Sequence, residues 1–264
     1  MNIGFIGGGN MGSAMMGGVI KGGLAKNSEV IVSDKYQPSL DRLKNELNVN
    51  TTTDNREVVK FADIIFLAVK PQMLSAAIDE IKDLDFKDKL VVSIAAGQSI
   101  SKITGLFGKN LKLIRVMPNT PALVGEGMAA LSPNELVSDE EAETVKKIFE
   151  SFGQAEIVPE KLQDVVTGVS GSSPAFVYMF IEAMADAAVA EGMPRAQAYK
   201  FAAQAVYGSA KMVLATGKHP GELKDAVCSP AGTTIEGVAA LESTGFRASV
   251  IDAVRLATEK SRQL

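Results

Sequence analysis

Small polar residues gather in one short stretch of the chain, the segment "SPAGTTIEG" that runs from Ser229 to Gly237. Its hydroxyl groups can donate hydrogen bonds, and its only ionisable side chain is Glu236. Placed where a helix begins, such a segment can bind a small carboxylate through hydroxyls and free backbone N–H groups. A plain turn accounts for the same residues, as does a capping box with Thr233 as N-cap and Glu236 as its partner.

A second stretch, "IGFIGGGNMGSAM" near the N-terminus, places Gly7, Gly9 and Gly12 in the spacing G-x-G-x-x-G. In a strand–turn–helix unit the first glycine permits the tight turn and the second lets the backbone approach a pyrophosphate. The third lets helix and strand pack closely. The free N–H groups and positive dipole end of the helix then attract phosphate. The motif predicts a dinucleotide site, and a merely glycine-rich turn is the alternative.

The residues after the second predicted strand, "VSDKYQPS", bear on which dinucleotide is bound. Asp34 suits the ribose diol of NAD. Ser33, Lys35 and Ser39 suit the 2′-phosphate of NADP, which an inward-pointing Asp34 would repel. Lys35 is equally well explained as a solvated surface lysine. These residues alone do not decide whether the cofactor is NADPH or NADH.

The sequence has few of the histidine and cysteine residues that other kinds of catalytic or metal site need. His219 is the one histidine in the sequence, which argues against a Ser-His-Asp site or a multi-histidine metal site, so we expect no metal. We interpret His219 as part of a helix start and Cys228 as a small apolar filler. The single cysteine permits no internal disulfide and fits a reducing cytoplasm. The net charge of −4 argues against nucleic acid or an acidic membrane surface as a partner.

The elements that must position these residues alternate in the first part of the chain. Helical stretches such as "PSLDRLKNEL" separate predicted strands that begin at Asn2, Glu29, Ile64, Leu90 and Leu111. Two further strands, "GMAALS" and "QAEIV", flank a helix for which Ser138 and Glu141 predict a capping box. This rhythm predicts a mostly parallel sheet with helices on both faces.

Past Pro159 the strand pattern stops, so we place a domain boundary near residue 160. Helices are predicted from Pro174, from Pro194, and near Glu222, Ile235 and Ser249.

The helix from Pro174 to Glu191 is apolar on nearly every side. It is short for a bilayer and carries Glu182 and Asp186, so we expect no membrane span. We expect it to pack against a second subunit as well as its own core. The alternative is the central helix of a monomeric bundle. The N-terminus lacks the pattern of a signal peptide, so we expect a cytoplasmic protein.

Small residues also follow later strands in "AVKPQ", "IAAGQS" and "VMPNTP", where open α/β sheets bind ligands. With "VSGSSPAF" and "LKDAVCSPAGTTIEGVAALESTGF", they make the chain resemble the pyrroline-5-carboxylate reductase family over essentially its whole length. The stretch from Leu223 to Phe246 is the most specific part and is similar to the family signature "DAVxSPGGTT…LExxGF". Ala231 stands where a glycine is often found, a change that we expect an uncrowded pocket to tolerate.

The resemblance implies an α/β fold with an N-terminal Rossmann-type doubly wound sheet, residues 1–160, that binds the dinucleotide. An all-helical C-terminal domain, residues 161–264, is implied to dimerise through interlocked helices and to bind substrate. Five dimers often assemble into a decamer in this family. The implied reaction is reduction of 1-pyrroline-5-carboxylate to L-proline, the final step of proline synthesis. NADPH is the favoured hydride donor, with NADH also possible.

The implied site has two parts. The substrate carboxylate suits Ser229, Gly232, Thr233 and Thr234, and the resemblance puts the Thr234 hydroxyl at the ring nitrogen as the catalytic candidate. The expected cofactor contacts are Ile6, Gly7, Gly9, Asn10, Met11, Gly12, Ser33, Asp34, Lys35, Asn55, Ala68, Val69, Lys70, Pro71, Ala95, Ala96 and Asn119.

Two other functions fit parts of the pattern. A β-hydroxyacid dehydrogenase also joins a Rossmann domain to a helical one, but it uses a lysine and an asparagine one turn apart on the first long helix of the second domain. Between Asp164 and Tyr199 this sequence has neither Lys nor Asn, which argues against such an enzyme. A non-enzymatic NAD(P) sensor would bind the cofactor without turnover and would leave the "SPAGTT" cluster without a small-molecule ligand.

Overall fold

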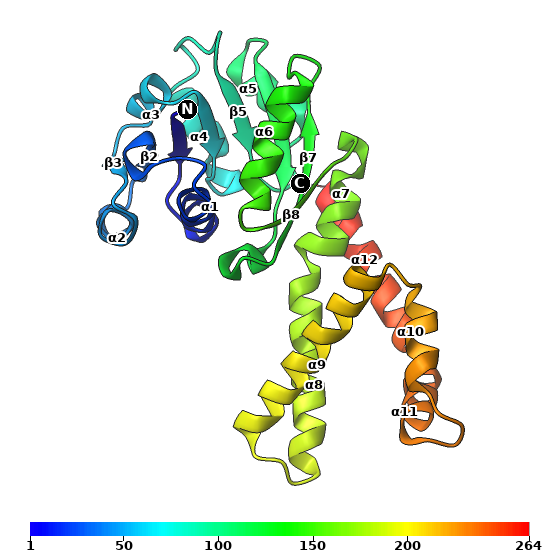
Figure 1. The fold of residues 1–264 in the computed structure, drawn as a ribbon. Coiled ribbons are helices and arrows are strands. Elements are labelled where there is room, and N and C mark those ends of the chain that lie inside the picture. Colours follow the sequence, from blue (N-terminus) through cyan, green and yellow to red (C-terminus); the bar gives the residue numbers. More distant parts are fainter. Residues whose placement is uncertain (264) are drawn as a thin grey trace. The chain divides into compact units, whose positions relative to one another are not determined.

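The computed structural model describes residues 1–263 and divides into two units (Figure 1). Unit 1 comprises Met1–Ser172 and the residues from Leu256 onward, and unit 2 is Ser173–Arg255. This division falls later than the boundary predicted near residue 160. The reason is a buried arginine of the sheet, Arg115, which pairs with Glu160 at 3.2 Å and with Asp164 at 3.5 Å. These pairs hold the segment after residue 160 against unit 1.

Unit 1 contains one sheet in the strand order β3-β2-β1-β4-β5-β6-β7-β8. Its neighbouring strands are parallel except for the antiparallel pair β6 and β7. The strands are β1 (Ile3–Ile6), β2 (Val30–Ser33), β3 (Asn50–Thr52), β4 (Ile64–Leu67), β5 (Leu90–Ser93), β6 (Lys112–Met117), β7 (Gly127–Pro133) and β8 (Gly153–Ile157). Seven of them match predicted strands, and β3 was not predicted.

Helices cover both faces of this sheet, as the sequence predicts (Figure 1). One face is covered by α1 (Asn10–Lys21), α2 (Gln37–Leu47) and α6 (Asp139–Glu150), and the other by α3 (Asn55–Phe61), α4 (Pro71–Asp79) and α5 (Ile100–Phe107). Successive strand residues point to opposite faces. Phe5 and Phe66 therefore stack at 4.8 Å in one core, while Ile6 and Leu67 enter the other.

The start of α6 confirms the predicted capping box. The Ser138 hydroxyl accepts from the Glu141 N–H at 3.2 Å, and the Glu141 carboxylate accepts from the Ser138 N–H at 3.0 Å. Glu141 also pairs with Lys112, the first residue of β6, at 2.6 Å. The cap therefore fixes both the start of α6 and its position beside the sheet.

Further helical segments complete unit 1. The short helix α7 (Gln163–Val166) runs into a π-helical turn at Thr167–Gly171. The end of α12 (Phe246–Arg262) returns to this region, where the Ser261 hydroxyl donates to the Asp164 carboxylate at 2.7 Å.

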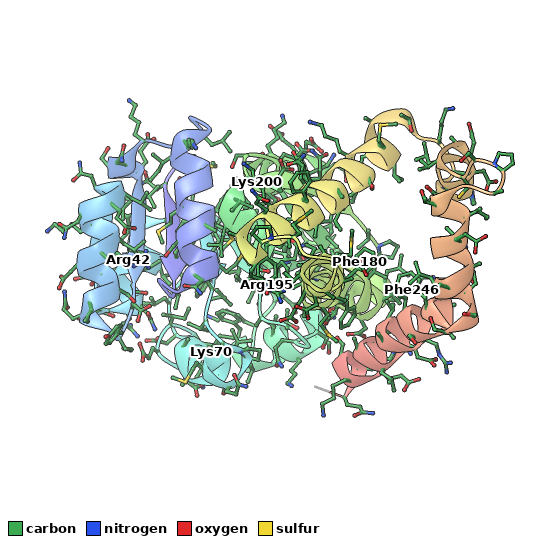
Figure 2. All side chains as sticks on the ribbon, turned by 90° about the horizontal axis from the view of Figure 1, so that it is seen from below. Arg42, Lys70, Phe180, Arg195, Lys200 and Phe246 are labelled. Carbon is green, nitrogen blue, oxygen red and sulfur yellow. The ribbon has the colours of Figure 1, made fainter. Side chains whose placement is uncertain are left out.

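Unit 2 contains the long helices α8 (Ser173–Ala190) and α9 (Arg195–Thr216) and the shorter α10 (Pro220–Val227) and α11 (Thr233–Ser243). Phe180 of α8 contacts Phe246 with ring centroids 5.9 Å apart (both labelled in Figure 2). The start of α10 matches its prediction, because His219 is the N-cap and Pro220 the first helical residue.

Little of the apolar surface of unit 2 is covered within one chain. Its buried apolar residues are the alanines Ala185, Ala198 and Ala202. Large side chains such as Met179, Phe201 and Leu214 are 68%, 66% and 82% exposed. By length and composition alone, the described chain has one helical stretch that could cross a membrane, Glu160–Ala190. An exposed apolar surface of this kind is equally what a large subunit interface requires.

Candidate functional site

The order of the sheet reverses between β1 and β4, which lie side by side inside the sheet. From β1 the chain proceeds to β2 and β3 on one side, and from β4 to β5 and β6 on the other. Open α/β sheets bind ligands at such a switch point, in the crevice outside the carboxyl ends of the strands. The glycine motif lies there, between β1 and α1.

The three motif glycines occupy the positions that their predicted roles require. Gly7 has a φ of +110°, and a Cβ on it would lie 2.5 Å from the Ala68 carbonyl oxygen. A Cβ on Gly12 would lie 2.5 Å from the Gly7 carbonyl oxygen. A Cβ on Gly9 would meet nothing within 4 Å and would only obstruct the approach of a ligand. The turn therefore fits a dinucleotide pyrophosphate.

The start of α1 offers both N–H groups and a nearby cation. Gly9 is its N-cap, and no side chain caps the first turn. Arg42 of α2 donates to the Ser13 hydroxyl at 2.9 Å and approaches the Gly8 carbonyl oxygen at 3.4 Å. A positive side chain and a helix N-terminus thus lie on the same glycine turn, where both favour phosphate.

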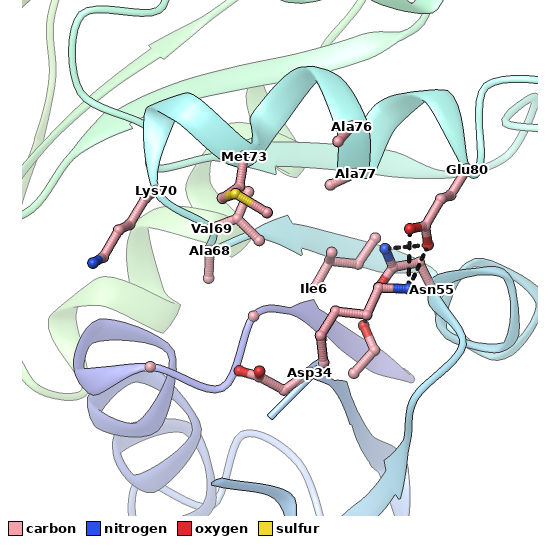
Figure 3. A pocket seen from close by; sticks show the side chains of 14 residues that line it. Ile6, Asp34, Asn55, Ala68, Val69, Lys70, Met73, Ala76, Ala77 and Glu80 are labelled. Atoms are coloured by element: carbon pink, nitrogen blue, oxygen red, sulfur yellow. Dashed lines mark hydrogen bonds and ion pairs between the residues drawn. The ribbon is translucent and has the colours of Figure 1, made fainter. Parts of the chain in front are cut away.

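The first pocket lies between the glycine turn, the end of β2 and one face of α4 (Figure 3). Asp34 lies in it but is held by the backbone, since Oδ2 accepts from the Gly8 N–H at 2.7 Å and Oδ1 from the Tyr36 N–H at 2.9 Å. This carboxylate therefore joins the glycine turn to the end of β2. The first pocket is lined by Ile6, Gly7, Gly9, Ser33, Asp34, Lys35, Asn55, Ala68, Val69, Lys70, Met73, Ala76, Ala77 and Glu80.

Four polar side chains are linked at the far end of the first pocket (Figure 3). The Ser33 hydroxyl donates to Asn55 Oδ1 at 2.6 Å, and Asn55 Nδ2 donates to Glu80 Oε2 at 2.8 Å. Lys35 Nζ lies 3.0 Å from both carboxylate oxygens of Glu80. Ser33 and Asn55 are buried, the Glu80 side chain is 39% exposed and the Lys35 side chain is 64% exposed.

A second pocket adjoins the first, because both include Gly9, Ala68, Val69 and Lys70. It extends along the carboxyl ends of β4, β5 and β6. Its remaining residues are Asn10, Met11, Pro71, Ile94, Ala96, Met117 and Pro118. The two pockets together form a groove that crosses the switch point of the sheet.

Most of the predicted cofactor residues line this groove, but Gly12, Ala95 and Asn119 line neither pocket. Ala95 is only 3% exposed. Asn119 uses its side-chain amide inside the protein, accepting from the Met128 N–H at 2.8 Å and donating to the Ser170 carbonyl at 3.1 Å. These three residues therefore lie outside the lining of the groove.

Sequence reasoning missed one face of α4 and the residue that follows this helix, Glu80. Met73, Ala76, Ala77 and Glu80 line the first pocket at a spacing of three and four residues. Residues so spaced share one face of a helix. This spacing, directly after "AVKPQ", was the signal that could have identified them.

The hydroxyl-rich segment forms the loop that leads into α11. Gly232 is the N-cap of α11, and no side chain caps the helix, so the capping box with Thr233 and Glu236 is wrong. Thr233 is instead the first residue of the helix. The Gly232 N–H donates to the Ser229 carbonyl at 3.0 Å, which closes a tight turn. A Cβ on Gly232 would overlap the Ser229 hydroxyl, so a larger residue here would force the Ser229 side chain to rotate away.

Ala231 in this loop has a φ of +55°, the left-handed conformation that favours glycine. The sequence-based expectation was that an uncrowded pocket tolerates alanine at this position. The structure adds that the backbone conformation itself favours glycine there. Thr234 is partly exposed in the single chain.

No group of three or more His, Cys, Asp or Glu side chains among residues 1–263 is arranged to hold a metal ion.

Family models match both parts of the chain. Residues 160–264 match the model for pyrroline-5-carboxylate reductase dimerisation. Residues 2–97 match a model described as NADP oxidoreductase, coenzyme F420-dependent.

Full-length relatives are similar throughout. The chain is 55% identical to the pyrroline-5-carboxylate reductase of Escherichia coli strain K12, over 99% of this chain and 97% of the relative. It is 48% identical to that of Methanosarcina acetivorans, with the same coverage of each chain.

Two solved structures are also similar to this chain over nearly its whole length. The Plasmodium falciparum pyrroline carboxylate reductase with NADP bound is 35% identical, with a TM-score of 0.90 over 100% of this chain and 97% of the other. The Coxiella burnetii pyrroline-5-carboxylate reductase is 33% identical, with a TM-score of 0.92 over 99% and 97%.

Proposed function

The chain belongs to the pyrroline-5-carboxylate reductase family, and we propose that it reduces 1-pyrroline-5-carboxylate to L-proline with NADPH as the preferred reductant. The observation that carries this proposal is the 55% identity with the Escherichia coli reductase over 99% of the chain. A match of this extent includes both the groove of unit 1 and the loop before α11. NADH is the second cofactor that we expect the enzyme to use.

The groove in unit 1 supports the cofactor part of the proposal. Gly7 and Gly9 open the turn to a pyrophosphate, and the start of α1 supplies N–H groups to it. The first pocket, at the end of β2, suits the adenosine half, and the second pocket suits the nicotinamide half. When bound, the nicotinamide supplies the hydride. Gly12, Ala95 and Asn119 contribute by fixing the shape of the groove.

The loop before α11 supports the substrate part. The substrate carries one carboxylate, and the uncapped first turn of α11 offers backbone N–H groups to an anion. The hydroxyls of Ser229 and Thr233 add donors beside them, and Gly232 lets the turn close. This set needs no charged side chain to hold the carboxylate.

Thr234 is the group that we assign to the ring nitrogen. A protonated cyclic imine is already electrophilic, so it needs orientation and a hydrogen-bond partner more than an acid. When the imine is already protonated, its N–H donates to the Thr234 oxygen, and hydride transfer to the carbon gives the neutral amine with no further proton. When the imine is neutral, the Thr234 hydroxyl donates to the nitrogen and relays a proton to it, which a hydroxyl is too weak an acid to supply unaided.

Residues 160–264 form a dimerisation domain, and the exposed apolar side chains of α8 and α9 support a homodimer built on it. We further propose that the protein works in the cytoplasm. Five dimers in a decamer are the larger assembly implied by the family resemblance.

The test is a spectrophotometric assay with 1-pyrroline-5-carboxylate and either NADPH or NADH, following the loss of reduced cofactor. We expect turnover with both and a higher kcat/KM with NADPH. Cofactor binding without turnover would contradict the proposal and favour a sensor. Oxidation of a β-hydroxyacid in place of imine reduction would favour the dehydrogenase alternative.

A further inference from the structure

The four linked side chains of the first pocket contain a carboxylate that no cofactor role explains. Glu80 lies directly after the last residue of α4 and reaches across the pocket to Lys35 and Asn55. Lys35 follows β2, and Asn55 is the first residue of α3. Three separate elements therefore bring their polar groups to one point beside the end of β2 (Figure 3).

Glu80 decides the orientation of the Asn55 amide. An ionised carboxylate only accepts hydrogen bonds, so the Asn55 atom that faces it is Nδ2, which leaves Oδ1 to accept from the Ser33 hydroxyl. Asn55 is 5% exposed and Ser33 is fully buried. The amide is therefore held at both ends.

The backbone of Glu80 is held as well. Arg56 Nη1 donates to the Glu80 carbonyl at 3.0 Å. The same guanidinium binds the Asp83 carboxylate through two bonds of 2.7 and 2.9 Å. Glu80 is therefore a positioned carboxylate, although its side chain is 39% exposed.

The donors that Glu80 occupies are those that a 2′-phosphate requires. In a Rossmann fold the end of β2 meets the adenosine ribose, so the 2′-substituent comes close to Ser33 and Lys35. A phosphate binds cations and N–H donors and is repelled by a carboxylate. A ribose 2′-hydroxyl is neutral and can donate to a carboxylate, so it suffers no such repulsion.

We propose that Glu80 is a specificity-determining residue, which competes with the 2′-phosphate of NADPH for Lys35 and Asn55 and so limits the preference for NADPH over NADH. The proposal rests on the proposed function in taking the first pocket as the adenosine side of the cofactor site. Glu80 thereby keeps NADH usable in a site where Ser33, Lys35 and Asn55 favour the phosphate.

The experiment compares 2′,5′-ADP with 5′-AMP as calorimetric probes of Glu80→Gln, because these nucleotides differ only in the 2′-phosphate. Glutamine keeps the length of the side chain and an oxygen acceptor for Asn55, and a thermal melt checks that the fold is retained. We expect 2′,5′-ADP to bind about fivefold more tightly, the upper range for a partly exposed charge pair. Binding of 5′-AMP should change by less than about twofold.

Asp79→Asn is the matched control. It removes the same charge one residue earlier, from a carboxylate that pairs with Lys82 at 2.7 Å and does not line the pocket. We expect this variant to leave the affinities for both probes as they are in the unmodified protein. An equal gain in Asp79→Asn would overturn the proposal, because the effect would then be one of net charge alone.

A double-mutant cycle with Lys35→Ala distinguishes two roles for Glu80. Glu80 either competes with the 2′-phosphate for Lys35 or holds Lys35 in place to bind the phosphate. If Glu80 acts by occupying Lys35, Glu80→Gln should improve 2′,5′-ADP binding less in the Lys35→Ala background than alone, because there is then no lysine to release. An unchanged or weaker affinity of Glu80→Gln for 2′,5′-ADP would overturn the proposal, since Glu80 would then be inert or would hold Lys35 ready for the phosphate. These binding measurements need no imine substrate, so their failure is distinguishable from a failure of the proposed reaction.

Discussion

The backbone N–H of Gly8 donates to the Asp34 carboxylate at 2.7 Å, which joins the glycine turn to the end of β2. The other oxygen of this carboxylate accepts from the Tyr36 N–H, so Asp34 organises the backbone on both sides of the pocket. An acidic residue at this point of a Rossmann fold commonly binds the ribose diol. Here its two oxygens are already bound to the protein.

Replacing Asp34 with Ala should therefore affect both cofactors. Two backbone N–H groups lose a charged acceptor, and we expect the free energy of unfolding to fall by about 1–3 kcal/mol. The KM values for NADPH and NADH should both rise, because the glycine turn holds the pyrophosphate common to them. Denaturant unfolding and steady-state kinetics measure these quantities. A loss confined to NADH, with normal stability, would show that Asp34 serves the ribose instead.

Much of unit 1 could be predicted from its sequence, because each buried strand alternates between two apolar cores. Ile64 and Phe66 enter one core and Ile65 and Leu67 the other, which gives a continuous apolar run. The strand β3 escaped prediction since its residues, Asn-Thr-Thr, are polar and lie at the edge of the sheet. It is a strand because it pairs with β2, and the sequence of Asn50–Thr52 alone does not indicate this pairing.

The site was predictable where backbone conformation is encoded by glycine, and less so elsewhere. Gly7 and Gly9 predict the turn from their spacing alone. The Asn119 side chain instead forms hydrogen bonds with the backbone of Met128 and Ser170. These contacts join segments distant in the sequence. The Glu80 network likewise needs three elements to meet, and its residue types alone do not indicate that they do.

The exposed apolar side chains of α8 and α9 predict an assembly that does not dissociate easily. We expect at least a dimer, with about 2,000 Å² or more of buried surface, as in obligate interfaces. Met179→Glu, at a side chain that is 68% exposed in the single chain, should weaken this assembly by placing a charge in an apolar interface. Light scattering at micromolar concentration measures the mass. A fully active monomer would contradict the prediction.

Ala231 has a backbone conformation that favours glycine, so a substitution at this position of the loop before α11 can stabilise the protein. Its φ of +55° costs an alanine about 1 kcal/mol relative to glycine, partly offset by the greater freedom of glycine in the unfolded chain. We expect Ala231→Gly to raise the free energy of unfolding by up to about 1 kcal/mol and to keep activity. Ala231→Val should lower it, since a β-branched residue is disfavoured there. Equal stability of all three proteins would argue that the loop adopts another conformation in solution.

Thr234 is the residue on which the proposed chemistry depends most directly. The absence of a side-chain cap on α11 removes the capping-box explanation for this segment and leaves the hydroxyl available for a ligand. Thr234→Ala deletes one hydrogen bond to the ring nitrogen, a loss of about 1–3 kcal/mol, which corresponds to about 5- to 150-fold in kcat/KM. Thr234→Ser keeps the hydroxyl and should keep most of the activity. The affinity for NADPH should barely change in either variant, because neither pocket of the groove includes Thr234.

The competing explanation for Thr234 is that it merely stabilises the first turn of α11. That explanation predicts a lower melting temperature for Thr234→Ala with normal kcat/KM. A catalytic role predicts the reverse, a melting temperature close to that of the unmodified protein with kcat/KM reduced, because the side chain caps no backbone group. Measuring both quantities on the Ala and Ser variants decides between them. An alanine variant that is active but less stable would rule out the catalytic role.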